Sequence, residues 1–252
     1  MLLPIKDYNP TNRTAYITIF FICINVVVFL YQGFFSERPL AYHIAESAMV
    51  PYEVTHLKNA PIPLGTDRIG RVVYYKGRTI NPFLSIFTSL FMHGSLWHLL
   101  GNMLFLWIFG NNIEDYLGKM RFIFFYLACG AGASLIHVLF NLNSTIPVVG
   151  ASGAVSGIMG AYLILYPNAK VRTLVFIFII ITFVDVPAFV FLVVWFVFQF
   201  FYAGGQSGIA WLAHVGGFVL GILLIKIMQQ RPRIRIKPRQ PRPDDIEIDI
   251  IQ

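Results

Sequence analysis

The tetrapeptide Gly150-Ala151-Ser152-Gly153 stands at the head of an apolar segment, and a serine between small residues means little alone. Two further polar motifs flank it, each within an apolar segment of its own. They read HGSLWHLLGN at residues 93–102 and AHVGG at residues 213–217, with Gly221 one turn further on. Polar groups are costly in apolar helices and usually serve a function there. The three motifs are therefore candidates for one shared site.

The composition indicates a membrane protein. The chain has 252 residues, of which 57% are hydrophobic and only 12% are charged, and its mean hydropathy is +0.68. A soluble domain carries roughly 25% charged residues. A chain with so few charges cannot cover a soluble surface, so we expect it to lie in a bilayer.

The positive charge of the chain is concentrated at one place. The net charge is +7, which could suggest a nucleic-acid partner, but seven of the 19 Lys and Arg residues lie between Lys226 and Arg242, beside an apolar helix. This arrangement is typical of a cytoplasmic tail at a membrane surface, and no nucleic-acid partner is expected. Cys23 and Cys129 lie in apolar segments and predict no disulfide framework.

Hydropathy predicts an all-α membrane protein with a bundle of six transmembrane helices. Residues 1–13 form a short cytoplasmic N-terminus, residues 14–228 the six-helix domain, and residues 229–252 a basic, disordered cytoplasmic tail. A spanning helix needs ~20 apolar residues. The expected helices cover about 15–33, 91–113, 122–140, 151–165, a segment starting near 187, and 209–228.

Two segments need a separate interpretation. The apolar run 173–203 would be roughly 45 Å long as one helix, against a core of ~30 Å. Asp185 and Pro187 interrupt it, so we read 171–185 as an interfacial loop with β-like character and start the fifth helix near Pro187. The long loop at 35–85 is expected to lie in part along the interface.

The distribution of Lys and Arg predicts the topology. These residues occur in the N-terminus, in the 2–3 turn, in the 4–5 loop and in the tail, which the positive-inside rule assigns to the cytoplasm. Helices 2, 4 and 6 then all begin on the outer side. His93 and His98 early in helix 2, Ser152 at the start of helix 4 and His214 early in helix 6 are thereby predicted at similar depth.

Small residues at intervals of four predict close packing of helices 4 and 6. Such packing would hold the hydroxyl of Ser152 near the ring of His214. The small residues are Gly153, Gly157 and Ala161 in helix 4, and Ala213, Gly217 and Gly221 in helix 6.

These residue types suit acyl transfer. A serine hydroxyl is a weak nucleophile until a base within reach takes its proton, and His214 is the natural base for Ser152. An oxyanion intermediate needs donors aimed at it, each worth ~3 kcal/mol or more. Asn102 and His98, four residues apart on one helix face, offer an amide and a ring N–H, and Ser152 offers its backbone N–H.

A third member of the triad is missing from the motifs. Glu114 and Asp185 are predicted on the cytoplasmic side, far from the other polar residues. We therefore expect a Ser–His dyad in which packing orients His214, with no cofactor and no metal.

Between residues 85 and 225 the sequence resembles the rhomboid family of intramembrane serine proteases. The resemblance lies in three motifs in family order, HxxxxHxxxN, GxSG and AHxxGxxxG, and in the acidic turn EDYLG at 114–118. It implies a six-helix core, a Ser–His dyad and a water-filled cavity open to the outside. It also implies that the partners are the lipid bilayer and single-pass membrane proteins, which are cleaved at or near their transmembrane segments.

Carried over residue by residue, the resemblance makes Ser152 the nucleophile and His214 the base. It places His98 and Asn102 at the oxyanion hole and gives supporting roles to His93, Gly150 and Gly153. Two departures stand out. Many members carry an aromatic residue one turn after the serine, where this chain has Ser156, and no clear Trp-Arg pair occurs in the 35–85 loop.

Three other functions compete. A catalytically silent relative would bind transmembrane segments, but such proteins generally lack the serine or the histidine. A metal-dependent hydrolase would use His93, His98 and His214, but no HExxH motif is present and a five-residue spacing suits helical ligation poorly. A transporter or channel would bring inverted repeats or more intramembrane charge. The expected location is a prokaryotic plasma membrane, with an organelle membrane as the alternative.

Overall fold

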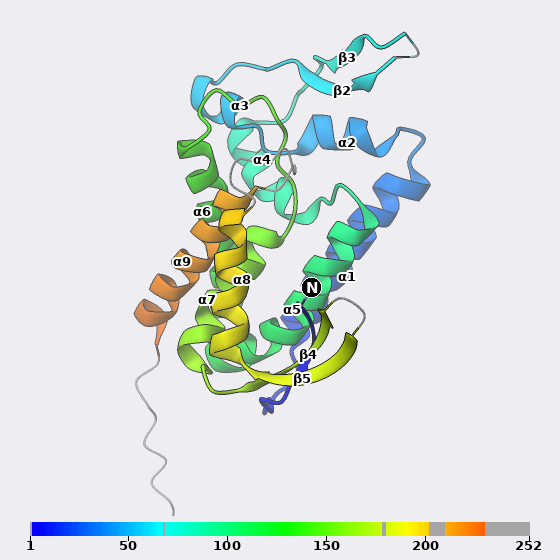
Figure 1. Cartoon of the computed structure of the whole chain (residues 1–252). Coiled ribbons are helices and arrows are strands. Elements are labelled where there is room, and N and C mark those ends of the chain that lie inside the picture. Colours follow the sequence, from blue (N-terminus) through cyan, green and yellow to red (C-terminus); the bar gives the residue numbers. More distant parts are fainter. Residues whose placement is uncertain (1, 68, 178–179, 202–209, 230–252) are drawn as a thin grey trace, which may run out of the picture.

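The protein is a bundle of apolar helices with a structured segment at each end (Figure 1). The computed structural model describes residues 2–67, 69–177, 180–201 and 210–229. The expected tail therefore lies outside the described residues from residue 230 onward, as does residue 209, the expected start of helix 6. The long helices of the bundle are α1 (Tyr16–Leu30), α5 (Leu96–Leu117), α6 (Lys119–Leu139), α7 (Ser152–Leu165), α8 (Ala188–Phe201) and α9 (Trp211–Met228).

The helices confirm a helical membrane protein. Within the described residues, three helices are long and apolar enough to cross a membrane, and a fourth crossing results if a bent pair counts as one span. The three are Tyr16–Phe35, which is α1 continued by a π-helical turn, and α6 and α9. Helices α7 and α8 are apolar but shorter. The number of six crossings remains a prediction.

The bent pair corrects one expectation about helix 2. Instead of one helix over 91–113, the chain forms α4 (Pro82–Thr88) with a 3₁₀ turn (Ser89–Phe91), turns by 80° and then starts α5 at Leu96. The side chain of Ser95 accepts a hydrogen bond from the backbone N–H of His98 at 3.2 Å, which is an N-cap. His93 therefore precedes the helix, and only His98 lies in its first turn.

The segment at 35–85 is a folded unit over one end of the bundle, which we call the loop end. It contains two short helices, α2 (Leu40–Ser47) and α3 (Pro51–His56), and the hairpin of β2 (Ile62–Thr66) with β3 (Val72–Tyr75). Glu53 and Arg78 form an ion pair at 2.9 Å inside this unit, with both side chains buried. An isolated β-bridge between Met49 and Val148 ties the unit to the loop that precedes α7.

The opposite end, which we call the sheet end, carries a three-stranded antiparallel sheet. The segment expected as an interfacial loop at 171–185 is a hairpin of β4 (Lys170–Ile177) and β5 (Ile180–Pro187). The β-like character is confirmed, but the loop is a regular strand pair. The expected short N-terminus contains a strand that the sequence analysis did not predict, because β1 (Leu2–Asp7) pairs with β4, Asp7 lying opposite Val171. Its strand partner is far away in the sequence, so local pattern did not reveal it.

Helix α7 occupies the centre of the bundle and packs against α5, α6 and α9. Every residue from Gly153 to Tyr162 is buried, which explains why this segment is rich in Gly, Ala and Ser. At the sheet end, the hydroxyl of Tyr162 donates a hydrogen bond of 2.7 Å to the carboxylate of Asp7 in β1. The N-terminal strand is thus bonded to the helix that begins with Ser152.

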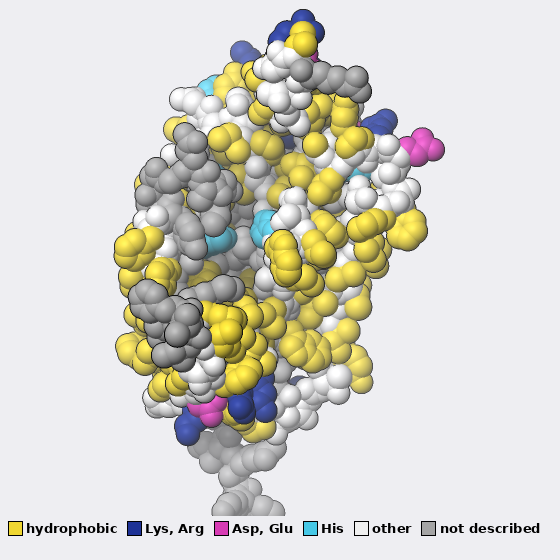
Figure 2. Space-filling view, turned by 45° about the vertical axis from the view of Figure 1, so that its right-hand side comes forward, with side chains coloured by type: hydrophobic (Ala, Val, Ile, Leu, Met, Phe, Trp, Pro, Cys, Tyr) yellow, Lys and Arg dark blue, Asp and Glu magenta, His cyan; other side chains and the backbone are white. Residues whose placement is uncertain are grey.

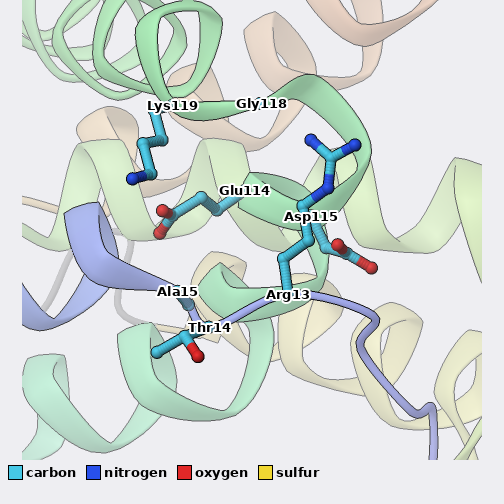
Figure 3. A pocket seen from close by; sticks show the side chains of 7 residues that line it. All are labelled: Arg13, Thr14, Ala15, Glu114, Asp115, Gly118 and Lys119. Atoms are coloured by element: carbon cyan, nitrogen blue, oxygen red, sulfur yellow. The ribbon is translucent and has the colours of Figure 1, made fainter.

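A small pocket of about 130 Å³ lies between α1, α5 and α6 (Figure 3). Glu114 caps the start of α1 there, because its carboxylate accepts hydrogen bonds from the backbone N–H groups of Ile17 and Thr18 at 3.0 and 2.7 Å. Negative charge at a helix N-terminus is stabilising. The side chains of Glu114 and Lys119 extend into the pocket from α5 and α6 (Figure 3). The geometry gives Glu114 a structural role and no link to Ser152.

Candidate active site

Ser152 is the first residue of α7, and the backbone before it has a special conformation. Gly150 has φ +124°, a region that L side chains rarely adopt, and its N–H donates to the carbonyl of Ser89 at 2.9 Å. A Cβ built on Gly150 would lie 2.8 Å from the ring of His98 and 3.7 Å from Oγ of Ser152. Only glycine fits between the two side chains, and the ring and the hydroxyl both face this position.

The first turns of α5 bring donors to the same place. His98 and Asn102 share one face of the helix, and the amide of Asn102 donates a hydrogen bond of 3.0 Å to the carbonyl of His98. An amide nitrogen has two protons, so one proton remains for a ligand. Both side chains line the same cavity as Ser152.

His93 lies apart from this cavity. It is fully buried at the bend between the 3₁₀ turn and α5, with its ring centroid 5.1 Å from that of His98 in an edge-to-face arrangement. Neither ring nitrogen has a hydrogen-bond partner among the described residues. Its contact is with His98, so its geometry fits a support of that ring.

Helices α7 and α9 approach so closely that their glycines cannot carry side chains. A Cβ on Gly221 would overlap the carbonyl of Gly157, and a Cβ on Gly217 would overlap the carbonyl of Gly153. On the other face of α7, a Cβ on Gly153 would lie 2.7 Å from Cβ of Ala133 in α6. Backbone contact of this kind fixes α7 and α9 relative to one another.

His214 in the first turn of α9 has a partner that sequence reasoning missed. The ring Nδ1 is 2.8 Å from Oε1 of Gln199, which lies on α8 and is 4% exposed. The ring of Trp195, one turn earlier on α8, lies 6.1 Å from that of His214. The hydrogen bond with Gln199 therefore adds to the packing that was expected to orient His214. The sequence does mark Gln199 as unusual, because it is the single strongly polar residue of the otherwise apolar helix α8.

The residue one turn after the serine forms its hydrogen bond within its own helix. The hydroxyl of Ser156 donates to the carbonyl of Ser152 at 2.6 Å, and the side chain is buried. Such a back-bond satisfies a hydroxyl within its own helix. The aromatic neighbour of His214 is Trp195 from another helix.

Ser152 and His214 line one cavity of about 1020 Å³, and residues of the loop that precedes α7 line it as well. Figure 2 shows histidine side chains at a hollow in the middle of one face of the molecule. The cavity also takes in His137, Asn141 and Ser144 at the end of α6 and after it. Its apolar wall includes Trp97, Phe105, Val155, Met159, Trp195 and Trp211.

The nucleophile and base candidates are not hydrogen-bonded to one another in this structure. No bond joins Oγ of Ser152 to His214 in the described part of the chain, and Nε2 of His214 has no partner there either. Hydrogen bonds in sites without substrate are often long and tighten only in the complex. The described residues also contain no group of three or more His, Cys, Asp or Glu side chains that could hold a metal ion.

The fold and this site together define a class, a helical membrane protein with a serine and a histidine facing one cavity between its helices. The family model of the Rhomboid domain matches residues 81–231. The chain therefore belongs to the rhomboid family.

The named relatives come from different organisms. Rhomboid protein 1, mitochondrial, of Saccharomyces cerevisiae is 35% identical over 151 residues, which is 56% of this chain and 40% of that protein. RHOMBOID-like protein 1 of Arabidopsis thaliana is 32% identical over 222 residues, 83% of this chain and 52% of that protein. Rhomboid protease GluP of Bacillus subtilis is 38% identical over 78 residues, 31% of this chain and 15% of that protein.

The chain spans about half the length or less of the first two of these relatives. Relatives with mitochondrial or plant names predominate, so the expected prokaryotic plasma membrane is not borne out. What the comparisons give is an integral membrane protein of the rhomboid family.

Proposed function

We propose that this chain is an intramembrane serine endopeptidase that cleaves transmembrane segments of single-pass membrane proteins. The observation that carries the proposal is the convergence of Ser152 and His214 on one cavity, on two helices whose backbones are in direct contact. Membership of a family that includes a protein named as a protease supports it.

In this proposal His214 acts through Nε2. Oγ of Ser152 attacks the carbonyl carbon of the scissile peptide while Nε2 takes the hydroxyl proton, and the tetrahedral intermediate then expels the amine with that proton. Water attacks the resulting ester by the same route and restores the serine. The backbone N–H of Ser152, the amide of Asn102 and the ring of His98 are the proposed donors to the oxyanion.

The site suits a substrate that comes from the bilayer. Hydrophobic side chains cover the middle of the molecule and basic side chains gather toward its two ends (Figure 2). The cavity combines an apolar wall with polar groups near the loop end. We propose that the loop end faces outward and that β1 and the end of α9, which both lie toward the sheet end (Figure 1), face the cytoplasm.

The test is cleavage of a model single-pass protein by purified enzyme in liposomes. Wild type is compared with Ser152→Ala and His214→Ala, with and without a chelator. Matched controls are Ser134→Ala, a buried serine of α6, and His56→Ala in α3, neither of which lines the cavity.

The proposal expects cleavage by wild type and both controls, no effect of the chelator, and loss of cleavage in both site variants. Cleavage by Ser152→Ala at the wild-type rate would overturn the serine mechanism. Binding of the substrate without cleavage by wild type would favour a catalytically silent member of the family.

A further inference from the structure

We propose that Gln199 holds the imidazole of His214 in the one tautomer that can accept the proton of Ser152. Gln199 would be a positioning residue, because it acts through His214 and does not touch the reacting atoms. The inference rests on the proposed function and adds a third member to the pair of residues that carries it.

The orientation of the Gln199 amide follows from its second hydrogen bond. Its Nε2 lies 3.0 Å from the backbone carbonyl of Trp195. A carbonyl oxygen can only accept, so the amide nitrogen must face Trp195 and the amide oxygen must face His214. The distance from Oε1 to Nδ1 is 2.8 Å, a normal hydrogen bond.

The tautomer of His214 follows from the same logic. Oε1 of Gln199 has no proton to give, so Nδ1 of His214 must carry the proton that they share. A neutral imidazole with its proton on Nδ1 has a free lone pair on Nε2. The other ring nitrogen, which faces no partner among the described residues, is then the proton acceptor that a general base requires.

A neutral amide suits this position better than a carboxylate. Gln199 is 4% exposed, and α8 contains no Lys, Arg, Asp or Glu. A carboxylate here would be buried among apolar side chains without a cation to pair with, at high cost. The amide has a donor and an acceptor, and both are satisfied, by Trp195 and by His214.

The surroundings limit the other motions of the ring. The ring of Trp195 lies 6.1 Å from His214 on one side and stacks on Phe218 of α9 at 6.1 Å. The backbone of α9 is held by its contact with α7. What packing leaves undecided is which nitrogen carries the proton, and the bond to Gln199 decides it.

A merely structural role for Gln199, as a polar link between α8 and α9, must be separated from this one. We would compare Gln199→Leu, which removes the acceptor, with Gln199→Glu, which keeps an acceptor at the same reach. Gln32→Leu is the matched control, because Gln32 is also a buried glutamine of an apolar helical segment and does not line the cavity.

Three readouts are needed: the kinetics of peptide cleavage, the rate at which a fluorophosphonate labels Ser152, and the tautomer of His214 from ¹⁵N-histidine spectra, with His214→Ala to assign the signal. We expect Gln199→Leu to lower kcat and the labelling rate about tenfold to a hundredfold with KM and Tm close to those of Gln32→Leu. Gln199→Glu should recover part of the rate. The Nδ1-protonated form should dominate in wild type and in Gln32→Leu, persist in Gln199→Glu, and lose its dominance in Gln199→Leu.

Unchanged labelling in Gln199→Leu, or a loss of rate fully explained by a lower Tm, would overturn the role of Gln199 while the proposed function stands. If wild type neither cleaves nor labels, the proposed function fails. The tautomer spectra then decide about Gln199 alone, since a mixture of tautomers in wild type contradicts the proposal.

Discussion

Gly221 of α9 lies against the carbonyl of Gly157 of α7 with no room for even one carbon atom between them. This contact sets the distance between the helix that begins with Ser152 and the helix that carries His214. A larger residue at either glycine would therefore change the distance between Ser152 and His214, although neither glycine lines the cavity.

Gly221→Ala should destabilise the protein by about 1–3 kcal/mol, because the new methyl group forces the two helices apart. Cleavage should fall more than the folded fraction does, since the serine and the histidine separate. The measurement is unfolding in detergent together with cleavage per folded molecule. Gly33→Ala is the control, because a Cβ there meets nothing within 4 Å. Equal stability of the two variants would contradict the close contact between Gly221 and the carbonyl of Gly157.

Gly150→Ala should reduce activity strongly, because the substitution both strains the backbone at φ +124° and pushes the ring of His98 aside. The strain alone is worth about 1–3 kcal/mol. Gly65→Ala provides the comparison, with φ +138° and nothing within 4 Å of a new Cβ. Both variants should lose stability, but only Gly150→Ala should lose cleavage per folded molecule. Wild-type cleavage per folded molecule in Gly150→Ala would show that activity does not depend on the present position of the His98 ring.

The ion pair of Glu53 and Arg78 should hold the unit at the loop end together. Arg78→Met leaves a buried carboxylate without its cation, which costs about 3–5 kcal/mol. Limited proteolysis within 35–85 is the measurement, and faster cutting is expected. Arg71→Met removes a pair of the same 2.9 Å length with Asp67 that is largely exposed on the arginine side, and it should change stability little because exposed ion pairs contribute little. Similar proteolysis of both variants would contradict this difference.

Burial raises the pKa of the Asp7 carboxyl, despite the hydrogen bonds from Tyr162 and Asn112 that oppose the shift. The folded state therefore binds this proton more tightly than the unfolded state, and stability must fall as the pH rises above about 4. The protection of the β1 and β4 amides against hydrogen exchange, taken relative to the intrinsic rate at each pH, should fall across that range. Asp7→Asn keeps an acceptor without the charge, so it should weaken the dependence of stability on pH. An unchanged pH profile in Asp7→Asn would show that another group causes this dependence.

Much of the fold could be predicted because hydropathy is a local property. The apolar runs led to the helices, and the small residues at intervals of four led to the packing of α7 on α9. The bend before Ser95 was missed because an apolar run does not show where it turns. The pairing of β1 with β4 joins residues far apart in the sequence and left no local trace.

In the site, too, the local motifs could be predicted and the contacts between distant helices could not. The motifs around His98, Ser152 and His214 led to residues that line one cavity. Gln199 was overlooked because a lone glutamine in an apolar helix does not reveal which partner it faces. Only the placement of α8 beside α9 gives the partner.

The most direct test of the central claim, a serine activated by His214, is covalent labelling by a fluorophosphonate followed by mass spectrometry of the peptides. The account predicts a single modification, on Ser152, in wild type and in Ser134→Ala, and none in His214→Ala. Modification of another serine such as Ser156, or labelling of Ser152 at the wild-type rate in His214→Ala, would contradict it.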